Sequence, residues 1–224
     1  MGIYVIFIVI ALVSYLVQSS LKNKFERYSQ MPIAMTGKEV AEKMLHDNGI
    51  YDVRVISTPG MLTDHFNPTD KTVNLSEGVY SSNSVAAAAV AAHECGHAVQ
   101  HATKYGALQL RSSLVPIVSF ASQWILWVLL AGLLLIEVMP QIMLAGIILF
   151  AMTTLFSIVT LPVEINASHR ALVWLDRSGI ATGRNNECAK DALKSAAYTY
   201  VVAALGSLAT LMYYVMIFMG RRRD

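Results

Sequence analysis

The sequence predicts a mainly α-helical, multi-pass membrane protein that carries a small α+β unit at the membrane surface. Hydrophobic residues make up 55% of the 224-residue chain and charged residues only 14%, whereas about a quarter of the residues of a soluble domain are charged. Four apolar runs are long enough to be interpreted as membrane helices. A polar segment between the first two runs has the mixed helix and strand patterns of a small folded unit.

Charge and cysteine content exclude several classes of protein. Seventeen Lys and Arg residues oppose fifteen Asp and Glu residues, giving a formal net charge of +2. The basic residues form no stripe that could follow the phosphates of a nucleic acid, so we expect no such partner. Cys95 and Cys188 are far apart in the chain, so the sequence predicts neither a disulfide framework nor a CxxC metal site.

The predicted spans organise the chain. They cover residues 3–17, 114–136, 141–162 and 197–219. The first run lacks the basic start and the cleavage site of a signal peptide, and we interpret it as a retained anchor. The predicted parts are therefore an anchor, a polar unit, a transmembrane hairpin, a second polar segment, and a last span with a basic tail, at residues 1–19, 20–113, 114–162, 163–195 and 196–224.

The hairpin determines which segments share a side of the membrane. Its turn is too short to form a domain, so we expect both polar segments on the same side. Basic residues near spans mark the cytoplasmic side, and both segments hold several of them while the turn holds none. The sequence therefore predicts a cytoplasmic working face. The basic tail at residues 221–223 conflicts with this, so either the larger number of basic residues decides or one run is re-entrant.

Local patterns predict the elements of the first polar segment. Residues 36–39 read Thr-Gly-Lys-Glu, a capping box that opens a short amphipathic helix, which Gly49 ends. Residues 52–56 and 71–75 are rich in β-branched side chains and predict two short strands. Residues 84–104 predict a half-buried helix that is too short to span a membrane.

This last helix carries His93, Glu94, Cys95, Gly96 and His97, which match the motif HExxH. The spacing places both imidazoles on one helical face, where they can share a zinc ion. Glu94 would take a proton from the metal-bound water and pass it to the leaving amine. Cys95 points away from the ligand face and is interpreted as a small core residue. The alternative, an ordinary helix with two hydrogen-bonded histidines, would bury polar groups in an alanine-rich helix without compensation.

A catalytic zinc site needs a third protein ligand. Glu164 follows the third span on the side assigned to the HExxH helix, and it is predicted to open a new helix. A lone carboxylate at the lipid boundary is costly unless it is paired or coordinated; the alternative is a carboxylate stabilised by the helix macrodipole. Ser168 could hydrogen-bond Glu164 from one turn away, and His169 is the alternative ligand.

Other polar residues near the motif have weaker cases. His101 continues the spacing of four, but one straight helix cannot wrap three turns around one ion. Gln100 and Thr103 stand where the longer HExxHxxGxxH motif has glycine and histidine, which excludes that class. A stabiliser of the tetrahedral oxyanion is expected besides zinc. The candidates are His169, Arg170 and Tyr105.

At these residues the chain resembles the YugP-like family of bacterial membrane zinc metallopeptidases and, more distantly, the HtpX-type membrane proteases. The resemblance extends over nearly the whole chain and is carried by residues 36–45, 63–68, 73–76, 91–100 and 162–168. It implies an integral peptidase of the bacterial cytoplasmic (inner) membrane with a gluzincin-type site, that is, HExxH plus a distant glutamate. The last segment usually reads Glu-Phe-Asp-Ala-Ser in that family, and here Asn166 replaces the aspartate.

The resemblance also gives the second predicted strand a meaning. By analogy with gluzincin-like peptidases, its residues Val73, Asn74 and Leu75 are expected to pair with an extended substrate. The alternative is a strand that only shields the helix. Asp64 and His65 in the preceding loop are further candidates for contact with metal or substrate, although a polar turn needs no function.

The sequence as a whole predicts a zinc-dependent membrane endopeptidase. His93, His97 and Glu164 hold Zn2+, and Glu94 acts as general base and acid. The expected substrates are polypeptides of the membrane or close to it, and the lipid bilayer surrounds the spans. Small residues in the fourth span would allow close packing within the chain, with a second copy or with a membrane partner. The alternative function is a non-catalytic zinc-containing membrane adaptor or regulator.

Overall fold

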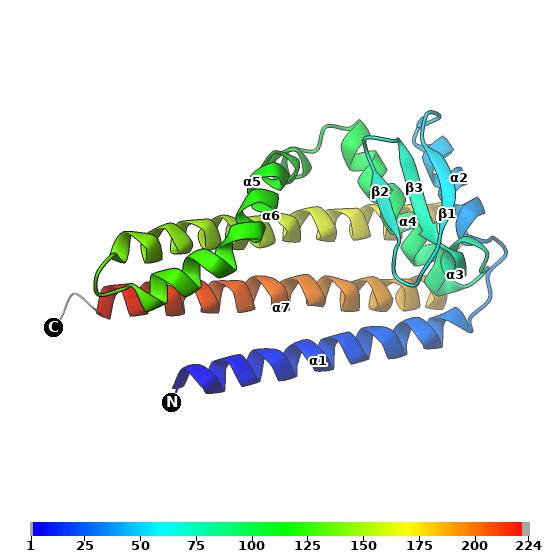
Figure 1. The fold of residues 1–224 in the computed structure, drawn as a ribbon. Helices are drawn as coiled ribbons and strands as arrows, with labels where there is room; N and C mark the ends of the chain where they lie inside the picture. Colours follow the sequence, from blue (N-terminus) through cyan, green and yellow to red (C-terminus); the bar gives the residue numbers. More distant parts are fainter. Residues whose placement is uncertain (1, 221–224) are drawn as a thin grey trace. The chain divides into compact units, whose positions relative to one another are not determined.

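The computed structural model of the chain describes the backbone of residues 2–220 and the side chains of that range except residues 2–4 and 6. The elements within it are α1 (Gly2–Ser29), α2 (Gly37–Asp47), β1 (Arg54–Thr58), β2 (His65–Asn67), β3 (Thr72–Ser76), α3 (Glu77–Tyr80), α4 (Val85–Ala102), α5 (Gly106–Leu134), α6 (Pro140–Arg177) and α7 (Arg184–Gly220) (Figure 1). The mainly helical class with a small sheet is confirmed.

The chain divides into two compact units. The first, which we call the apolar unit, comprises residues 1–15, 109–161 and 199–224. The second, which we call the site unit, comprises residues 16–108 and 162–198.

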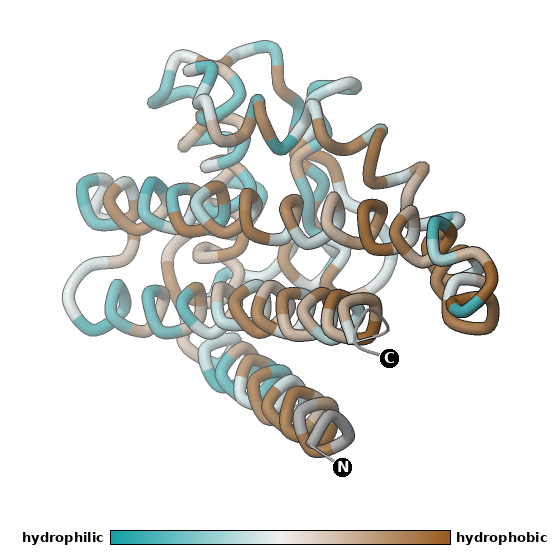
Figure 2. Tube along the Cα trace, turned by 90° about the vertical axis from the view of Figure 1, so that its left-hand side faces the viewer, coloured by the Kyte–Doolittle hydropathy of each residue, from teal (hydrophilic) through white to brown (hydrophobic). Residues whose placement is uncertain are grey.

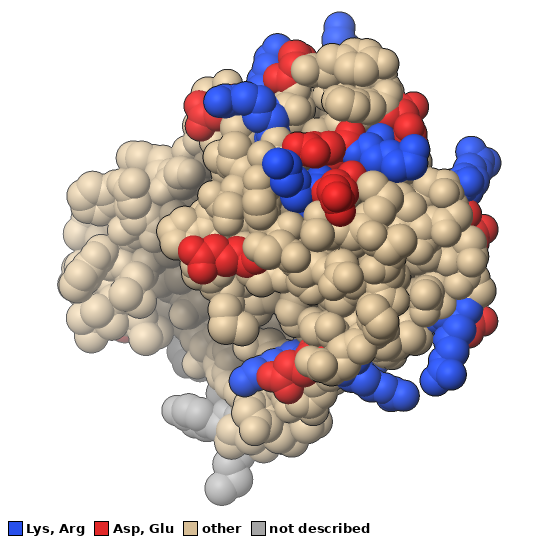
Figure 3. Space-filling view, turned by 90° about the vertical axis from the view of Figure 1, so that its right-hand side faces the viewer, with Lys and Arg blue, Asp and Glu red and all other residues tan. Residues whose placement is uncertain are grey.

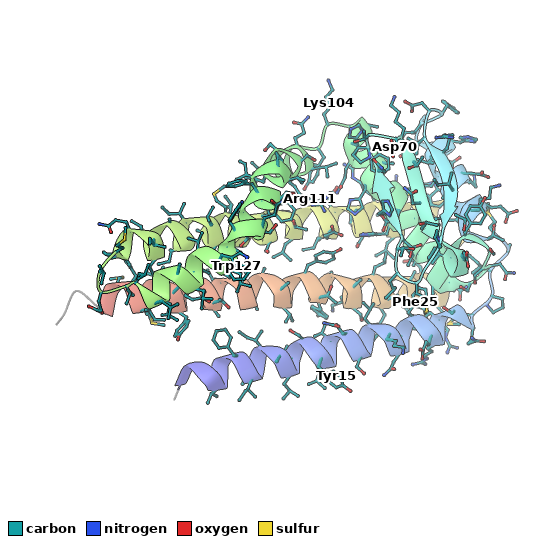
Figure 4. The ribbon with its side chains drawn as sticks, in the orientation of Figure 1. Tyr15, Phe25, Asp70, Lys104, Arg111 and Trp127 are labelled. Atoms are coloured by element: carbon teal, nitrogen blue, oxygen red, sulfur yellow. The ribbon has the colours of Figure 1, made fainter. Side chains whose placement is uncertain are left out.

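Three helices of the described chain, α5, α6 and α7, are long and apolar enough to cross a membrane. Their apolar stretches are brown in Figure 2, and Trp127 of α5 is 64% exposed (Figure 4). The prediction of four spans is therefore wrong by one for the described residues. The predicted first span begins in residues whose side chains are outside the description, and the rest of α1 turns polar at Lys22, Lys24 and Arg27.

Small residues let the helices of the apolar unit approach closely. A Cβ atom on Gly132 of α5 would lie 2.6 Å from the Cα atom of Met143 in α6. Ser207 of α7 donates a hydrogen bond to the Thr154 hydroxyl of α6 over 2.9 Å. The small residues of the last span thus make a contact within the chain.

Helix α2 begins with the predicted capping box. The Thr36 hydroxyl accepts a hydrogen bond from the backbone N–H of Glu39 (3.3 Å), and the Glu39 carboxylate accepts one from the backbone N–H of Thr36 (2.7 Å). The helix buries its apolar face, including Val40, Met44 and Leu45, in the main core of the site unit. Charged side chains of both signs are scattered over the surface of this unit (Figure 3).

The sheet has the strand order β1-β3-β2. Strand β3 runs parallel to β1 and antiparallel to β2, and all five of its residues are buried. Strands β1 and β3 correspond to the two predicted strands, shifted by one or two residues. Strand β2 was not predicted, because Asn67 and Pro68 at its end signal a turn.

Helix α4 is the central element of the site unit. Ser84 caps it by accepting a hydrogen bond from the backbone N–H of Ala87 over 3.2 Å, so the helix begins where the sequence predicts. Its alanines at positions 86–89, 91 and 92 are at most 2% exposed. Side chains this small let the neighbouring elements pack close to the helix that carries HExxH.

Helix α6 differs from the prediction. It continues without a break from Pro140 to Arg177, with Pro162 inside it. Glu164 therefore lies in the interior of a long helix and does not open a new one. The alternative of a carboxylate stabilised by a helix N-terminus is not available, because that effect falls off within the first turn.

Candidate metal site

Three predicted ligand residues converge in the site unit. The Nε2 atom of His93 lies 3.2 Å from Oε2 of Glu164, and the Nε2 atom of His97 lies 3.6 Å from the same oxygen. One candidate ligand atom from each residue lies within 4.8 Å of the others. Two ligands each about 2.1 Å from a tetrahedral zinc ion lie about 3.4 Å apart. The donor types and their separations therefore fit zinc.

The environment of these atoms favours a cation. The side chain of Glu164 is 5% exposed and that of His97 12%, and a carboxylate so deeply buried needs a positive partner. Burial lowers the pKa of His97, but the nearby carboxylates of Glu164 and Glu94 outweigh this effect and raise the pKa overall. The site has an excess of negative charge that a divalent ion would balance.

Gly96 explains how α4 and α6 come close enough to bring the ligands together. A Cβ atom at this position would lie 2.6 Å from the backbone oxygen of Ala167. A distance this short leaves no room for a side chain, so the backbones of the two helices are in contact here. Ala167 lies three residues after Glu164 in α6, and the contact therefore sets Glu164 opposite the two histidines.

Outer polar residues contact the rings of both histidines. The Ser168 hydroxyl lies 3.1 Å from Nδ1 of His93, whereas the sequence predicted that Ser168 would hydrogen-bond Glu164. Gln100 is fully buried, and its Oε1 lies 3.1 Å from Nδ1 of His97. Sequence reasoning missed this role of Gln100, although its position one turn after His97 places the two side chains on the same face of α4.

Glu94, the predicted base, is 9% exposed and follows His93 directly in α4. The other candidates have different surroundings. His169 is exposed and is not part of the ligand group. The ring of His101 lies at a tilt to the ring of Phe66, with 5.8 Å between the ring centroids. Of the candidates for oxyanion stabilisation, Arg170 instead donates from Nε to Oδ1 of Asn166 over 2.7 Å, and the backbone N–H of Tyr105 donates to the Gln100 carbonyl.

The predicted substrate strand needs a correction. Val73 and Asn74 are paired with β1 on one side and β2 on the other, and Leu75 is paired with β1 and fully buried. Because β3 is the central strand, its backbone is not free to receive a substrate, and the edges of the sheet are β1 and β2.

The two loop candidates before that strand have structural contacts. The Asp64 carboxylate accepts a hydrogen bond from the backbone N–H of Ser76 over 2.7 Å and fixes the end of β3. His65 lies in β2, and its Nδ1 lies 2.7 Å from the Thr63 carbonyl. Neither residue belongs to the group formed by His93, His97 and Glu164.

Comparisons with known proteins identify the family of the chain. Residues 3–219 match the family described as "Putative neutral zinc metallopeptidase". The chain is 43% identical over 213 residues to the "Putative membrane protease YugP" of Bacillus subtilis (strain 168), and the match covers 94% of each chain. No solved structure matches the chain significantly. The chain therefore belongs to the YugP-like family of neutral zinc metallopeptidases, whose cofactor is Zn2+.

Proposed function

We propose that the protein is a gluzincin-type endopeptidase that hydrolyses peptide bonds of membrane or membrane-proximal polypeptides. The observation that carries this proposal is the convergence of His93, His97 and Glu164, from two different helices, with nitrogen to oxygen separations of 3.2 and 3.6 Å. Two imidazoles and one carboxylate form a ligand set that leaves a zinc ion open to a further ligand, as catalytic sites require. Membership of a zinc metallopeptidase family supports it.

Each residue has a defined part in the proposed reaction. His93, His97 and Glu164 would hold the zinc ion, which when bound supplies a Lewis acid that polarises a carbonyl group and lowers the pKa of water. Glu94 takes a proton from the attacking water as the water oxygen adds to the scissile carbonyl carbon. It then gives that proton to the amine nitrogen as the C–N bond breaks. The second proton of the water then passes from the new carboxyl group to the amine, so the products are a carboxylate and an ammonium group.

The membrane setting supports the class of substrate. Three helices of the described chain are apolar enough to cross a membrane, and the similar Bacillus subtilis protein is named a membrane protease. We place the protein in the bacterial cytoplasmic membrane. The distribution of basic residues supports a site on the cytoplasmic side.

The experiment that tests this function is the substitution Glu94→Gln, compared with Glu77→Gln at an exposed position of α3. The variant loses the proton carrier and keeps all three ligands. We expect zinc content to stay near that of the wild type and cleavage of membrane proteins, followed as fragments in cells that express each protein, to fall by about 100-fold or more. Unchanged cleavage in Glu94→Gln would contradict the catalytic role of Glu94. It would favour the alternative function of a non-catalytic membrane adaptor or regulator.

A further inference from the structure

The geometry points to a hydrogen-bond relay, from Arg170 through Asn166 and Gln100 to His97, that holds the His97 ring in the tautomer able to bind zinc. Gln100 is then a positioning residue of the site, because it acts through His97 and touches no substrate. The inference rests on the proposed function, since it takes His97 as a zinc ligand. Each step follows from which atoms can donate and which can only accept a hydrogen bond.

The relay begins at Arg170. A guanidinium group has five donors and no acceptor. Its Nε lies 2.7 Å from the terminal amide of Asn166, so the amide atom facing it is the oxygen, Oδ1. The ambiguity between oxygen and nitrogen that affects any asparagine side chain is thereby resolved at this position.

The orientation of Asn166 fixes that of Gln100. The amide of Gln100 contacts two groups that can only accept a hydrogen bond. They are Oδ1 of Asn166 at 3.0 Å and the backbone oxygen of Val163 at 2.8 Å. The atom facing them is therefore the amide nitrogen, Nε2, and its two hydrogens match the two acceptors. Gln100 must then present its oxygen, Oε1, on the opposite side.

That oxygen lies 3.1 Å from Nδ1 of His97. An amide oxygen only accepts, so Nδ1 carries the hydrogen and Nε2 of His97 has a free lone pair. It is Nε2 that faces Glu164, at 3.6 Å. A neutral imidazole in this form is the zinc ligand, and the hydrogen bond at its other nitrogen sets the direction of the ring.

The contact between Ser168 and His93 does not fix the tautomer of the His93 ring. Ser168 lies 3.1 Å from Nδ1 of His93, and a hydroxyl group can donate or accept. It therefore follows whichever tautomer the ring adopts, while Gln100 imposes one. The relay also ties the two halves of the site together, because Val163 and Asn166 flank Glu164 in α6 and Gln100 belongs to α4.

Burial makes the loss of a hydrogen bond in the relay costly. Gln100 is 0% exposed, so water cannot replace a lost partner, and an unpaired buried amide is costly. Asn166→Asp keeps an oxygen acceptor for both Arg170 and Gln100. Asn166→Ala removes the one oxygen, Oδ1, that accepts from both Arg170 and Gln100. This pair of variants separates the relay from general packing.

The test measures metal binding by the full-length protein in detergent. Zinc affinity is measured by competition with a chromophoric chelator, and ligand geometry by the d–d absorption spectrum of the Co2+-loaded protein. We expect Gln100→Leu to bind zinc about 10–100-fold more weakly with an altered Co2+ spectrum. Asn166→Ala should also bind zinc more weakly, whereas the zinc affinity of Asn166→Asp should stay within about twofold of the wild type.

Gln109→Leu, at an exposed position of α5, is the control for the same exchange. Wild-type affinity and spectrum in Gln100→Leu would overturn the relay, as would equal losses in Asn166→Asp and Asn166→Ala. If Gln100→Leu does not fold, the Asn166 pair decides alone. These readouts need no cleavage, so a wild-type protein that binds zinc but cleaves nothing contradicts the proposed function and leaves the relay standing.

Discussion

At the scale of single residues, the site depends on side chains that would be unfavourable alone and that become favourable together. Glu164 is 4% exposed in the interior of α6, where an unpaired carboxylate would destabilise the fold. The two imidazoles and the ion they are proposed to share remove that cost. His93, Glu94 and His97 could be predicted because the motif is local. The contacts of Gln100 with Val163 and Asn166 could not, because these two partners lie more than 60 residues away in the chain.

The ion pair between Asp52 and Lys71 leads to a prediction about pH. Lys71 donates a hydrogen bond of 2.6 Å to Asp52, and this bond, with the lysine charge, lowers the pKa of Asp52. The pair therefore stabilises the fold above the unfolded pKa of about 3.9, and the contribution is lost as pH falls from there through the folded pKa.

Thermal unfolding of the wild type and Asp52→Asn, measured from pH 6 down to acid, checks this. The difference in stability between them should shrink as the pH falls below about 4, because the Asp52 carboxylate is protonated first in the unfolded chain and, at still lower pH, in the folded protein. The pair is exposed, so the effect should be small and should weaken with added salt. Asp176→Asn serves as the control. A difference that grows at acid pH would contradict the assignment.

At the scale of elements, local signals predicted some boundaries well and others poorly. The capping box and Ser84 place the starts of α2 and α4 correctly, since each depends on neighbouring residues. The break expected after Pro162 does not occur. A proline inside a helix removes one hydrogen bond, and packing of α6 in the site unit, where Val163 and Ala167 are fully buried, offsets this loss. Such packing is not visible in the sequence.

The contact of α4 with α6 at Gly96 leads to a second prediction. Gly96→Ala would place a methyl group against the Ala167 carbonyl and force the helices apart, at a cost of about 1–3 kcal/mol of stability. Because the ligands belong to both helices, zinc affinity should fall as well. Thermal unfolding and chelator competition measure the two effects.

Gly78→Ala is the matched control, because a Cβ atom there meets no atom within 4 Å. It should leave zinc affinity unchanged. A Gly96→Ala protein with wild-type stability and wild-type zinc affinity would show that the two helices do not need this contact.

At the scale of the whole molecule, hydropathy predicted the membrane class, the class of fold and three of the candidate spans. It did not predict that helices α6 and α7 each include residues of both units. Hydropathy marks where the apolar stretch ends, but the helical backbone continues into the more polar residues. Helix α6 therefore carries both Glu164 and an apolar stretch long enough to span a membrane.

The side of the membrane that holds the site unit is a testable prediction at this scale. Met61 lies in a loop and is 82% exposed. Met61→Cys, in a protein without its two native cysteines, should resist a membrane-impermeant thiol reagent in intact cells and react after the cells are opened. Ready labelling in intact cells would place the site outside the cytoplasm.

The most direct test of the account is the zinc affinity of purified Glu164→Ala, with Glu187→Ala at an exposed position of α7 as control. Loss of a residue that hydrogen-bonds a metal ligand weakens metal binding about 10–100-fold. Loss of the ligand itself should weaken metal binding further. We predict that Glu164→Ala retains little zinc while Glu187→Ala binds as the wild type. Stoichiometric zinc at wild-type affinity in Glu164→Ala would contradict the site.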